Sequence, residues 1–116
     1  MRAQKLEIQQ IITNKANNKQ DFTFCLKNKD KRYIVGIKNI YKGANPSLKC
    51  SLISDISNVL KNYTFDSIGG WMDKNTNVYY LDANMHYNDK IEALKVAKKI
   101  GEIAIFDTLK NKVINL

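Results

Sequence analysis

A row of polar side chains in the second half of the chain has the residue types that acid–base chemistry uses. Tyr80, Asp82, Asn84 and His86 each stand two residues apart. Residues two apart on a β-strand point to the same face of a sheet. The stretch therefore predicts an Asp, an Asn and the one histidine of the sequence on a single surface. A carboxylate near an imidazole can act as a general acid and base, or can bind a metal ion weakly.

The spacing of this row argues against catalysis. Residues two apart on a strand lie about 7 Å from one another, too far for a direct hydrogen bond without a bridging ligand. Ordinary alternation, with the polar side chains in solvent, explains the same pattern, and no second convergent segment is evident. We therefore predict that the protein is not an enzyme. An enzyme that uses Asp82 and His86 ranks last among the functions considered.

The sequence offers no motif for a cofactor or a metal. Gly69-Gly70 lacks both the GxGxxG repeat and the GKS/T ending of phosphate-binding loops. Cys25 and Cys50 lack CxxC spacing, and one histidine does not complete a Cys/His zinc site. We expect both thiols to be reduced and to lie in or near the core. We predict no cofactor and no metal site.

The net positive charge of the chain comes from its first half. Residues 1–64 contain 12 Lys or Arg against 4 Asp or Glu, whereas residues 65–116 contain 7 of each. Such an imbalance is typical of a surface that faces an acidic partner, most often nucleic acid. The alternative is a solvated lysine surface, because an AT-rich genome produces the same excess of Lys, Asn and Ile.

The basic side chains are densest at the tip of a predicted hairpin and continue onto its second strand. The predicted nucleic-acid-binding residues are Lys27, Lys29, Lys31, Arg32, Lys38 and Lys42. Such a tip can track phosphates, each contact releasing condensed counterions. Hairpin tips are polar in any case, and the sequence has no zinc-finger spacing, RNP aromatics or GXXG loop. The signal is electrostatic only.

An aromatic-rich hairpin is the second candidate contact surface. It contains Trp71, Tyr79 and Tyr80. If the hairpin stays partly exposed, these residues are typical of protein-interaction anchors, since Trp and Tyr dominate interface hot spots. The alternative is that they build the core. Edge strands, including a short C-terminal one, leave pairing with a second copy of the chain or with a partner open.

The elements that position these residues alternate between helices and hairpins. The predicted helices cover 3–18, 46–63 and 90–100, and the predicted strands cover 21–26, 33–37, 65–71, 78–85, 103–106 and 113–116. The order α-ββ-α-ββ-α-ββ predicts an α+β fold, an antiparallel sheet of hairpins with about three helices packed on one face. At 116 residues the chain is expected to form a single domain, 1–116.

The helices differ in the strength of their signals. The second has the clearest apolar face: Leu52, Ile53, Ile56, Val59, Leu60 and Tyr63. Asn45 and Pro46 are expected to open it, as cap and first residue. Asp89 is expected to cap the third helix, which Gly101 ends in a left-handed conformation.

Two further patterns concern the surroundings of the protein. No apolar run approaches the roughly 18 residues needed to span a bilayer. The N-terminal residues lead into a mixed segment instead of a hydrophobic signal core. We therefore expect a cytoplasmic protein that makes no membrane contact.

A series of short motifs runs from Gly69 to Ile114. It consists of Gly69-Gly70-Trp71, Tyr79-Tyr80-Leu81-Asp82-Ala83-Asn84, Ala93-Leu94, Ala97 and Gly101-Glu102-Ile103-Ala104-Ile105-Phe106-Asp107. Gly69-Gly70 permits a bulge or a turn. The series covers about 40% of the chain and resembles a segment of small bacteriophage and mobile-element proteins. The resemblance implies a genomic context, and a host-cell cytoplasm, without implying an activity.

These patterns lead to two functional hypotheses of different classes. The first is a phage or mobile-element accessory protein whose basic N-terminal half binds nucleic acid or a nucleoprotein complex. The alternative is a protein-binding inhibitor or adaptor directed at a host or anti-phage defence factor, with Trp71 and its neighbours as anchors.

Overall fold

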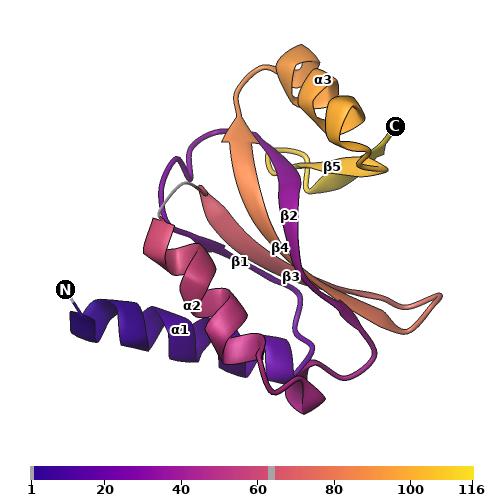
Figure 1. Ribbon diagram of the computed structural model, residues 1–116. Helices are drawn as coiled ribbons and strands as arrows, with labels where there is room; N and C mark the ends of the chain where they lie inside the picture. Colours follow the sequence, from indigo (N-terminus) through magenta and orange to yellow (C-terminus); the bar gives the residue numbers. More distant parts are fainter. Residues whose placement is uncertain (1, 63–64) are drawn as a thin grey trace.

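One six-stranded antiparallel sheet organises the protein (Figure 1). The computed structural model describes residues 2–62 and 65–116. The elements are α1 (Arg2–Asn17), β1 (Phe22–Cys25), β2 (Tyr33–Gly43), a 3-10 turn η1 (Pro46–Leu48), α2 (Leu52–Asn62), β3 (Ser67–Asp73), β4 (Val78–Tyr87), α3 (Lys90–Ile100), β5 (Ala104–Asp107) and β6 (Lys112–Asn115). The strand order is β1-β3-β4-β2-β5-β6. The predicted α+β class is confirmed.

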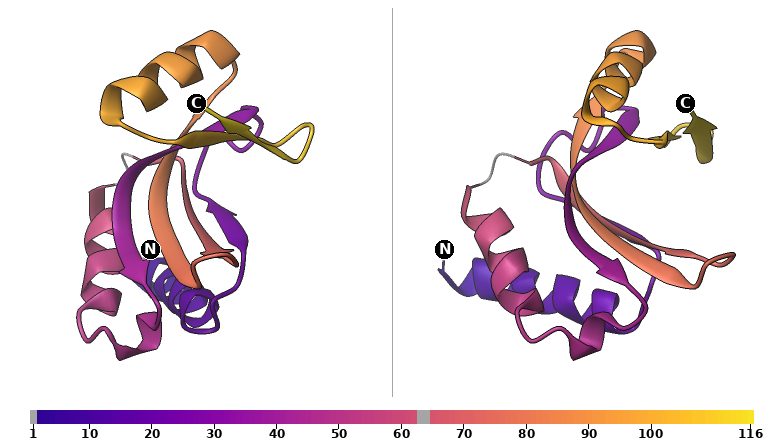
Figure 2. Two further views of the ribbon diagram at one scale, coloured as in Figure 1. Left: turned by 90° about the vertical axis from the view of Figure 1, so that its right-hand side faces the viewer. Right: turned by 45° about the vertical axis from the view of Figure 1, so that its right-hand side comes forward.

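The main core lies between β4 and the helices α1 and α2, which lie side by side against the sheet (Figures 1 and 2). Alternation along β4 directs Tyr79, Leu81 and Ala83 to this side, where all three are fully buried. Ile56 of α2 and Ile12 of α1 pack into the same cluster. Four residues of the apolar face predicted for the second helix therefore form the core: Leu52, Ile56, Val59 and Leu60. Ile53, a fifth, is 53% exposed, and Tyr63 lies outside the described residues.

The third helix covers the other end of the same face. Ala93 and Ala97 of α3 pack with Val35 of β2 in a second cluster. Both alanines are fully buried, and their small side chains let the helix approach the sheet closely. The expected cap and stop are confirmed: the Asp89 carboxylate accepts a hydrogen bond from a first-turn N–H, and Gly101 has φ 84°.

The predicted hairpin of β1 with β2 is wrong. β1 pairs with β3 at one edge, whereas β2 lies between β4 and β5. Residues 26–32, here called the crossover, therefore connect the sheet edge to its middle. Asp66 holds the crossover in place, since its carbonyl accepts from the N–H groups of Leu26 and Lys27, and its carboxylate accepts from Asn28 at 2.7 Å. The polar run that indicates a turn serves this longer connection instead.

Two smaller expectations also differ from the structure. Asn45 makes no side-chain capping bond, and Pro46 opens the separate turn η1, so that α2 begins only at Leu52. Cys25 and Cys50 are free and exposed instead of near the core. Cys25 lies on the edge strand β1, and Cys50 lies in the connection before α2, so neither side chain is covered.

Candidate binding groove

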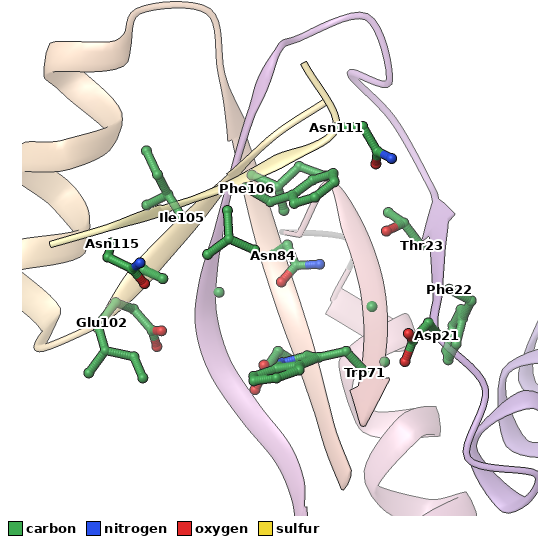
Figure 3. Close-up of a pocket in the computed structure, with 18 residues that line it drawn as sticks. Asp21, Phe22, Thr23, Trp71, Asn84, Glu102, Ile105, Phe106, Asn111 and Asn115 are labelled. Carbon is green, nitrogen blue, oxygen red and sulfur yellow. The ribbon is translucent and has the colours of Figure 1, made fainter. Parts of the chain in front are cut away.

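The side of the sheet opposite the helices is hollowed into a groove (Figure 3). Its volume is about 660 Å³, within the usual range for ligand sites. The register of β2 against β4 shifts between Gly36 and Lys38 and again between Asn39 and Tyr41. Such bulges bend a strand and increase its twist. The bend curls the sheet, so that the β3–β4 and β5–β6 hairpins flank the groove.

Glycines leave room on the floor of the groove. Gly36 and Ser67 pair with Asn84 on either side of β4. A Cβ atom at Gly69 would lie 3.0 Å from Asn84 Nδ2, so the glycine makes space for that amide. Gly70 points to the other face, where a Cβ would overlap the Tyr79 hydroxyl. Both glycines lie in a regularly paired strand, so the bulge or turn expected there is absent from these residues.

An aromatic pair lies at one side of the groove, and Trp71 is its member in the lining. Trp71 stacks on Tyr80, its partner across β3 and β4, with ring centroids 4.8 Å apart and planes 13° apart. The Lys42 ammonium lies 5.6 Å from the Tyr80 ring centroid. Trp71 remains 44% exposed. Tyr79, the third predicted anchor, is fully buried and donates its hydroxyl hydrogen to the Gln20 carbonyl, so it cannot contact a partner.

Carboxylates give the groove an acidic lining. Asp82 accepts a hydrogen bond from Asn39 at 2.9 Å, and burial raises the pKa of Asp82 although that bond opposes the shift. Burial also raises the pKa of Glu102, and the nearby charge of Asp82 adds to the effect. Asp21 is the third acidic lining residue, and no Lys, Arg or His belongs to the described lining. This is notable in a chain with 19 Lys or Arg against 11 Asp or Glu.

His86 takes part in a buried network instead of pairing with Asp82. Its Nε2 lies 2.7 Å from Ser67 Oγ, and its Nδ1 lies 3.1 Å from the Asn28 carbonyl oxygen. Burial lowers the pKa of His86, which favours the neutral ring. The network links the crossover to β3 and β4. Ser67 is fully buried, which keeps its hydroxyl away from a substrate.

The expectation that the polar row of β4 faces solvent is therefore wrong at two of its positions. Asn84 is only 6% exposed and His86 only 2%. For His86 the crossover is the physical reason, because its backbone meets the histidine ring at Asn28, whereas Asn84 donates to the buried Ser67 hydroxyl of β3. Alternation along β4 correctly predicts which side chains share a face, but it does not reveal what covers them.

The predicted nucleic-acid-binding lysines occupy different parts of the molecule. Lys27 and Lys29 are exposed on the crossover, and Lys31 is half-buried there. Lys38 and Lys42 follow along β2, a strand of 11 residues. At about 3.3 Å per residue this strand is roughly 35 Å long. The structure thus brings the first three lysines together and places the other two progressively further away.

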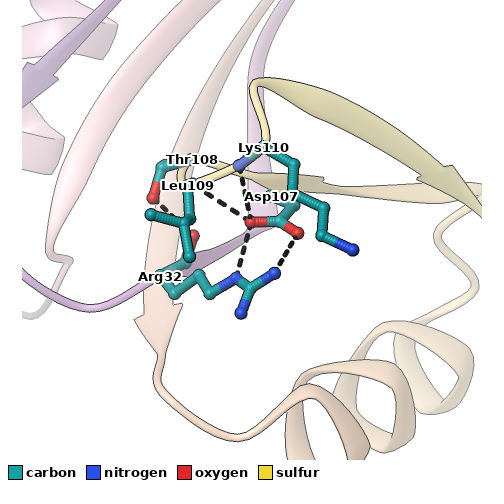
Figure 4. A network of polar contacts seen from close by, with 5 residues as sticks. All are labelled: Arg32, Asp107, Thr108, Leu109 and Lys110. Atoms are coloured by element: carbon teal, nitrogen blue, oxygen red, sulfur yellow. Dashed lines mark hydrogen bonds and ion pairs between the residues drawn. The ribbon is translucent and has the colours of Figure 1, made fainter.

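Arg32 joins β2 to the β5–β6 hairpin (Figure 4). Its Nε and Nη2 donate to the two carboxylate oxygens of Asp107 at 2.7 and 2.8 Å. These bonds lower the pKa of Asp107 to about 2. The guanidinium also lies 4.9 Å from the Tyr33 ring centroid. Through both contacts Arg32 has a structural role. Contact with a phosphate, as predicted, would require the guanidinium to share or leave these partners.

The lining of the groove also includes residues that the sequence did not indicate as site residues. Glu102, Ile103 and Phe106 bring the segment after α3 into its lining. Their signal is weak, because only the alternation of Ala104 and Phe106 along β5 indicates a shared face. Nothing local in the sequence shows that this segment meets β3 across the groove.

Fold and site together define an α+β protein with one helix-covered sheet face and one open, acidic sheet face. No family model, curated protein or solved structure matches the chain. The resemblance to phage and mobile-element proteins stays a prediction. None of the described helices has the length and apolarity for a bilayer crossing. Within the described residues, no three His, Cys, Asp or Glu side chains gather in a way that could hold a metal ion.

Proposed function

We propose that the protein binds a segment of a partner protein in this groove and acts as a protein-binding inhibitor or adaptor. The half-exposed Trp71 at the rim carries the proposal. Tryptophan is, with tyrosine and arginine, among the residues enriched at the hot spots of protein interfaces. The stack on Tyr80 holds the indole in place before a partner arrives, so binding costs little side-chain entropy.

The lining of the groove determines the chemistry of the partner segment. Ile103, Phe106 and Val113 supply an apolar wall, and the carboxylates supply negative charge. Because no cationic side chain belongs to the described lining, the complementary occupant carries apolar and positively charged side chains. A polyphosphate backbone would meet repulsion inside the groove.

Panning a library of short random peptides on the immobilised protein tests this function. We expect enriched peptides to bind the wild type and to lose about tenfold or more in affinity for Trp71→Ala, as is typical of a hot-spot truncation. Ile91→Ala is the matched control, since Ile91 is 65% exposed on α3 and lies outside the groove. Peptides that bind both variants equally, or no enrichment, would contradict the proposal.

The crossover supports a second candidate, the binding of nucleic acid or of a nucleoprotein complex. The observation in its favour is that Lys27 and Lys29 are exposed on one short segment, with Lys31 beside them. Here the phosphates would contact the end of the sheet and leave the groove empty. Each phosphate contact makes binding weaker as salt rises.

Charge reversal separates a specific nucleic-acid site from the general effect of net charge. The test variant changes Lys27, Lys29 and Lys31 to Glu, and the control changes the exposed Lys95, Lys98 and Lys99 of α3 in the same way. A crossover site predicts that only the first variant reduces the salt needed to elute the protein from heparin or DNA. Equal losses in both variants would rule out a site on the crossover.

A further inference from the structure

We propose that the floor of the groove binds the guanidinium group of an arginine side chain through Asp82, Asn84 and Glu102. This inference rests on the proposed function, because it names the side chain that the groove takes from its protein partner.

A chain of hydrogen bonds fixes the orientation of the Asn84 amide. The Asn28 carbonyl can only accept, so His86 Nδ1 carries the ring hydrogen and donates to it. The neutral ring then accepts at Nε2, and the Ser67 hydroxyl must donate to it. The Ser67 hydroxyl donates its only hydrogen to His86, so toward Asn84 it can only accept. Asn84 therefore turns its NH₂ group to Ser67, with Nδ2 3.0 Å from Oγ. The carbonyl Oδ1 of Asn84 is left for the groove.

That oxygen is an acceptor without a donor among the described residues. Asn84 is 94% buried, being 6% exposed, and its printed hydrogen bond uses Nδ2 alone. Oδ1 lies on the side of Gly36, which also lines the groove (Figure 3). None of the side-chain oxygens in the described residues is both buried and without a partner, so Oδ1 is open to water from the groove, and a ligand that donates to it takes the place of that water. The network thus makes this part of the floor an acceptor.

Two carboxylates extend the same acceptor surface. Asp82 uses Oδ1 for Asn39, and its other oxygen has no donor among the described residues. Glu102 has no side-chain hydrogen bond within the described chain and is close enough to be affected by the charge of Asp82. Acceptors therefore come from β4 and from the segment before β5. A positively charged group with several N–H donors would satisfy them together.

Arginine fits this arrangement better than lysine. The guanidinium is planar and has five N–H donors in a fixed fork, which suits two carboxylates and an amide on different elements. It also stacks on aromatic faces, and Trp71 lies diagonally next to Asp82 in the strand register. An ammonium is a compact charge with three donors that is more strongly hydrated. The floor is thus predicted to prefer arginine.

The experiment uses the peptides that panning on the full chain enriches. We expect them to contain arginine, and replacement of that arginine by citrulline, which is neutral and nearly the same shape, to weaken binding about 10- to 100-fold, as loss of a charged hydrogen-bond partner does. Replacement by lysine should weaken binding less. Asp82→Asn combined with Glu102→Gln should remove the difference between arginine and citrulline, whereas Asp30→Asn, on the exposed crossover, should not.

A second variant tests the orientation of the amide without changing the charge of the groove. Ser67→Ala removes the acceptor that holds the Asn84 NH₂, so the amide can turn, and we expect the preference for arginine over citrulline to fall. A thermal melt of each variant confirms that it is folded before binding is measured. An unchanged preference in folded Ser67→Ala would overturn the role of the network.

The outcomes separate this inference from the proposed function. Enriched peptides that need Trp71 but bind equally well with citrulline would overturn the arginine site and leave protein binding intact. If panning enriches no peptides that bind the wild type better than Trp71→Ala, both the proposed function and the arginine site would be overturned. Enriched arginine peptides whose preference survives Asp82→Asn with Glu102→Gln would place the arginine elsewhere and also overturn the inference.

Discussion

The two faces of the sheet are built from alternate residues of the same strands, yet they differ in almost every physical property. On one side of β4, Leu81 and Ala83 are fully buried under α1 and α2. On the other side, Asp82 and the half-buried Tyr80 line or flank an open groove. If the proposed function is right, binding resides on the open face, whereas most of the apolar core lies on the helix-covered face. Substitutions on the helix-covered face should therefore cost more stability than substitutions of side chains that line the groove.

Removing a core side chain should give the largest effect on stability. Ile56 is fully buried between α2 and the sheet. We expect Ile56→Ala to lower the free energy of unfolding by about 2–5 kcal/mol. Trp71→Ala, on the open face, should cost only about 0.5–1.5 kcal/mol, the value of a lost aromatic stack. Urea unfolding measures both, and equal losses would show that the open face is part of the core.

Two glycines allow the same substitution to be compared on the two faces. At Gly70 a Cβ would collide with the Tyr79 hydroxyl and the Phe22 ring, so Gly70→Ala should destabilise the protein by about 1–3 kcal/mol. At Gly36 a Cβ would make ordinary contacts of 3.6 Å with Asp82 and Asn84. Gly36→Ala should therefore be close to neutral, or gain up to about 1 kcal/mol from reduced chain entropy. The reverse order in urea unfolding would contradict the assignment of faces.

The buried network under the groove should make stability depend on pH. Burial lowers the pKa of His86 below its ordinary value of 6.5, so the unfolded chain binds the proton more tightly than the folded chain. The stability that the neutral, buried His86 ring contributes is therefore fully present above about pH 6.5, and it is lost as the pH falls toward the pKa of the folded state. His86→Gln should show a smaller loss of melting temperature between neutral and mildly acidic pH. An identical loss in both proteins would mean that His86 is not the group responsible.

The smallest expected effect concerns the Arg32–Asp107 pair, where the groove wall joins the sheet. Arg32→Gln should raise the pKa of Asp107 from about 2 toward the ordinary aspartate value, since its main hydrogen-bond donors are lost. An NMR titration of the side-chain carboxyl measures this shift directly. Stability that Asp107 contributes above its unfolded pKa should then be lost at higher pH than in the wild type. An unchanged titration would show that the turn amides after Asp107 hold the carboxylate without Arg32.

The sequence predicts the helix-covered face better than the open one. The apolar spacing from Leu52 to Leu60 and the alternation of Tyr79 and Leu81 are local signals, and both are confirmed. The cap at Asp89 is also local and confirmed. The core forms where apolar residues share one face of an element. The periodicity of the sequence shows which residues share a face, even when the strand order is unknown.

The open face depends on contacts between segments that are far apart in the sequence, and the periodicity of the sequence does not indicate such contacts. The crossover covers His86 only because β1 pairs with β3, and the polar run from Lys27 to Arg32 indicates a tight turn just as well as a crossover. Glu102 reaches the groove because the sheet curls at the bulges of β2. The sequence gives no sign that Arg32 is paired, because its partner Asp107 lies 75 residues further along the chain.

The position of a bound peptide on the protein tests the central claim most directly. Amide NMR shifts of the full chain, measured with a panned arginine peptide, should change along the concave face near Gly36, Gly69, Asp82 and Glu102 and stay unchanged on α1 and α2. Shifts that cluster on the helices, or on the crossover alone, would contradict the claim that the open sheet face is the binding face.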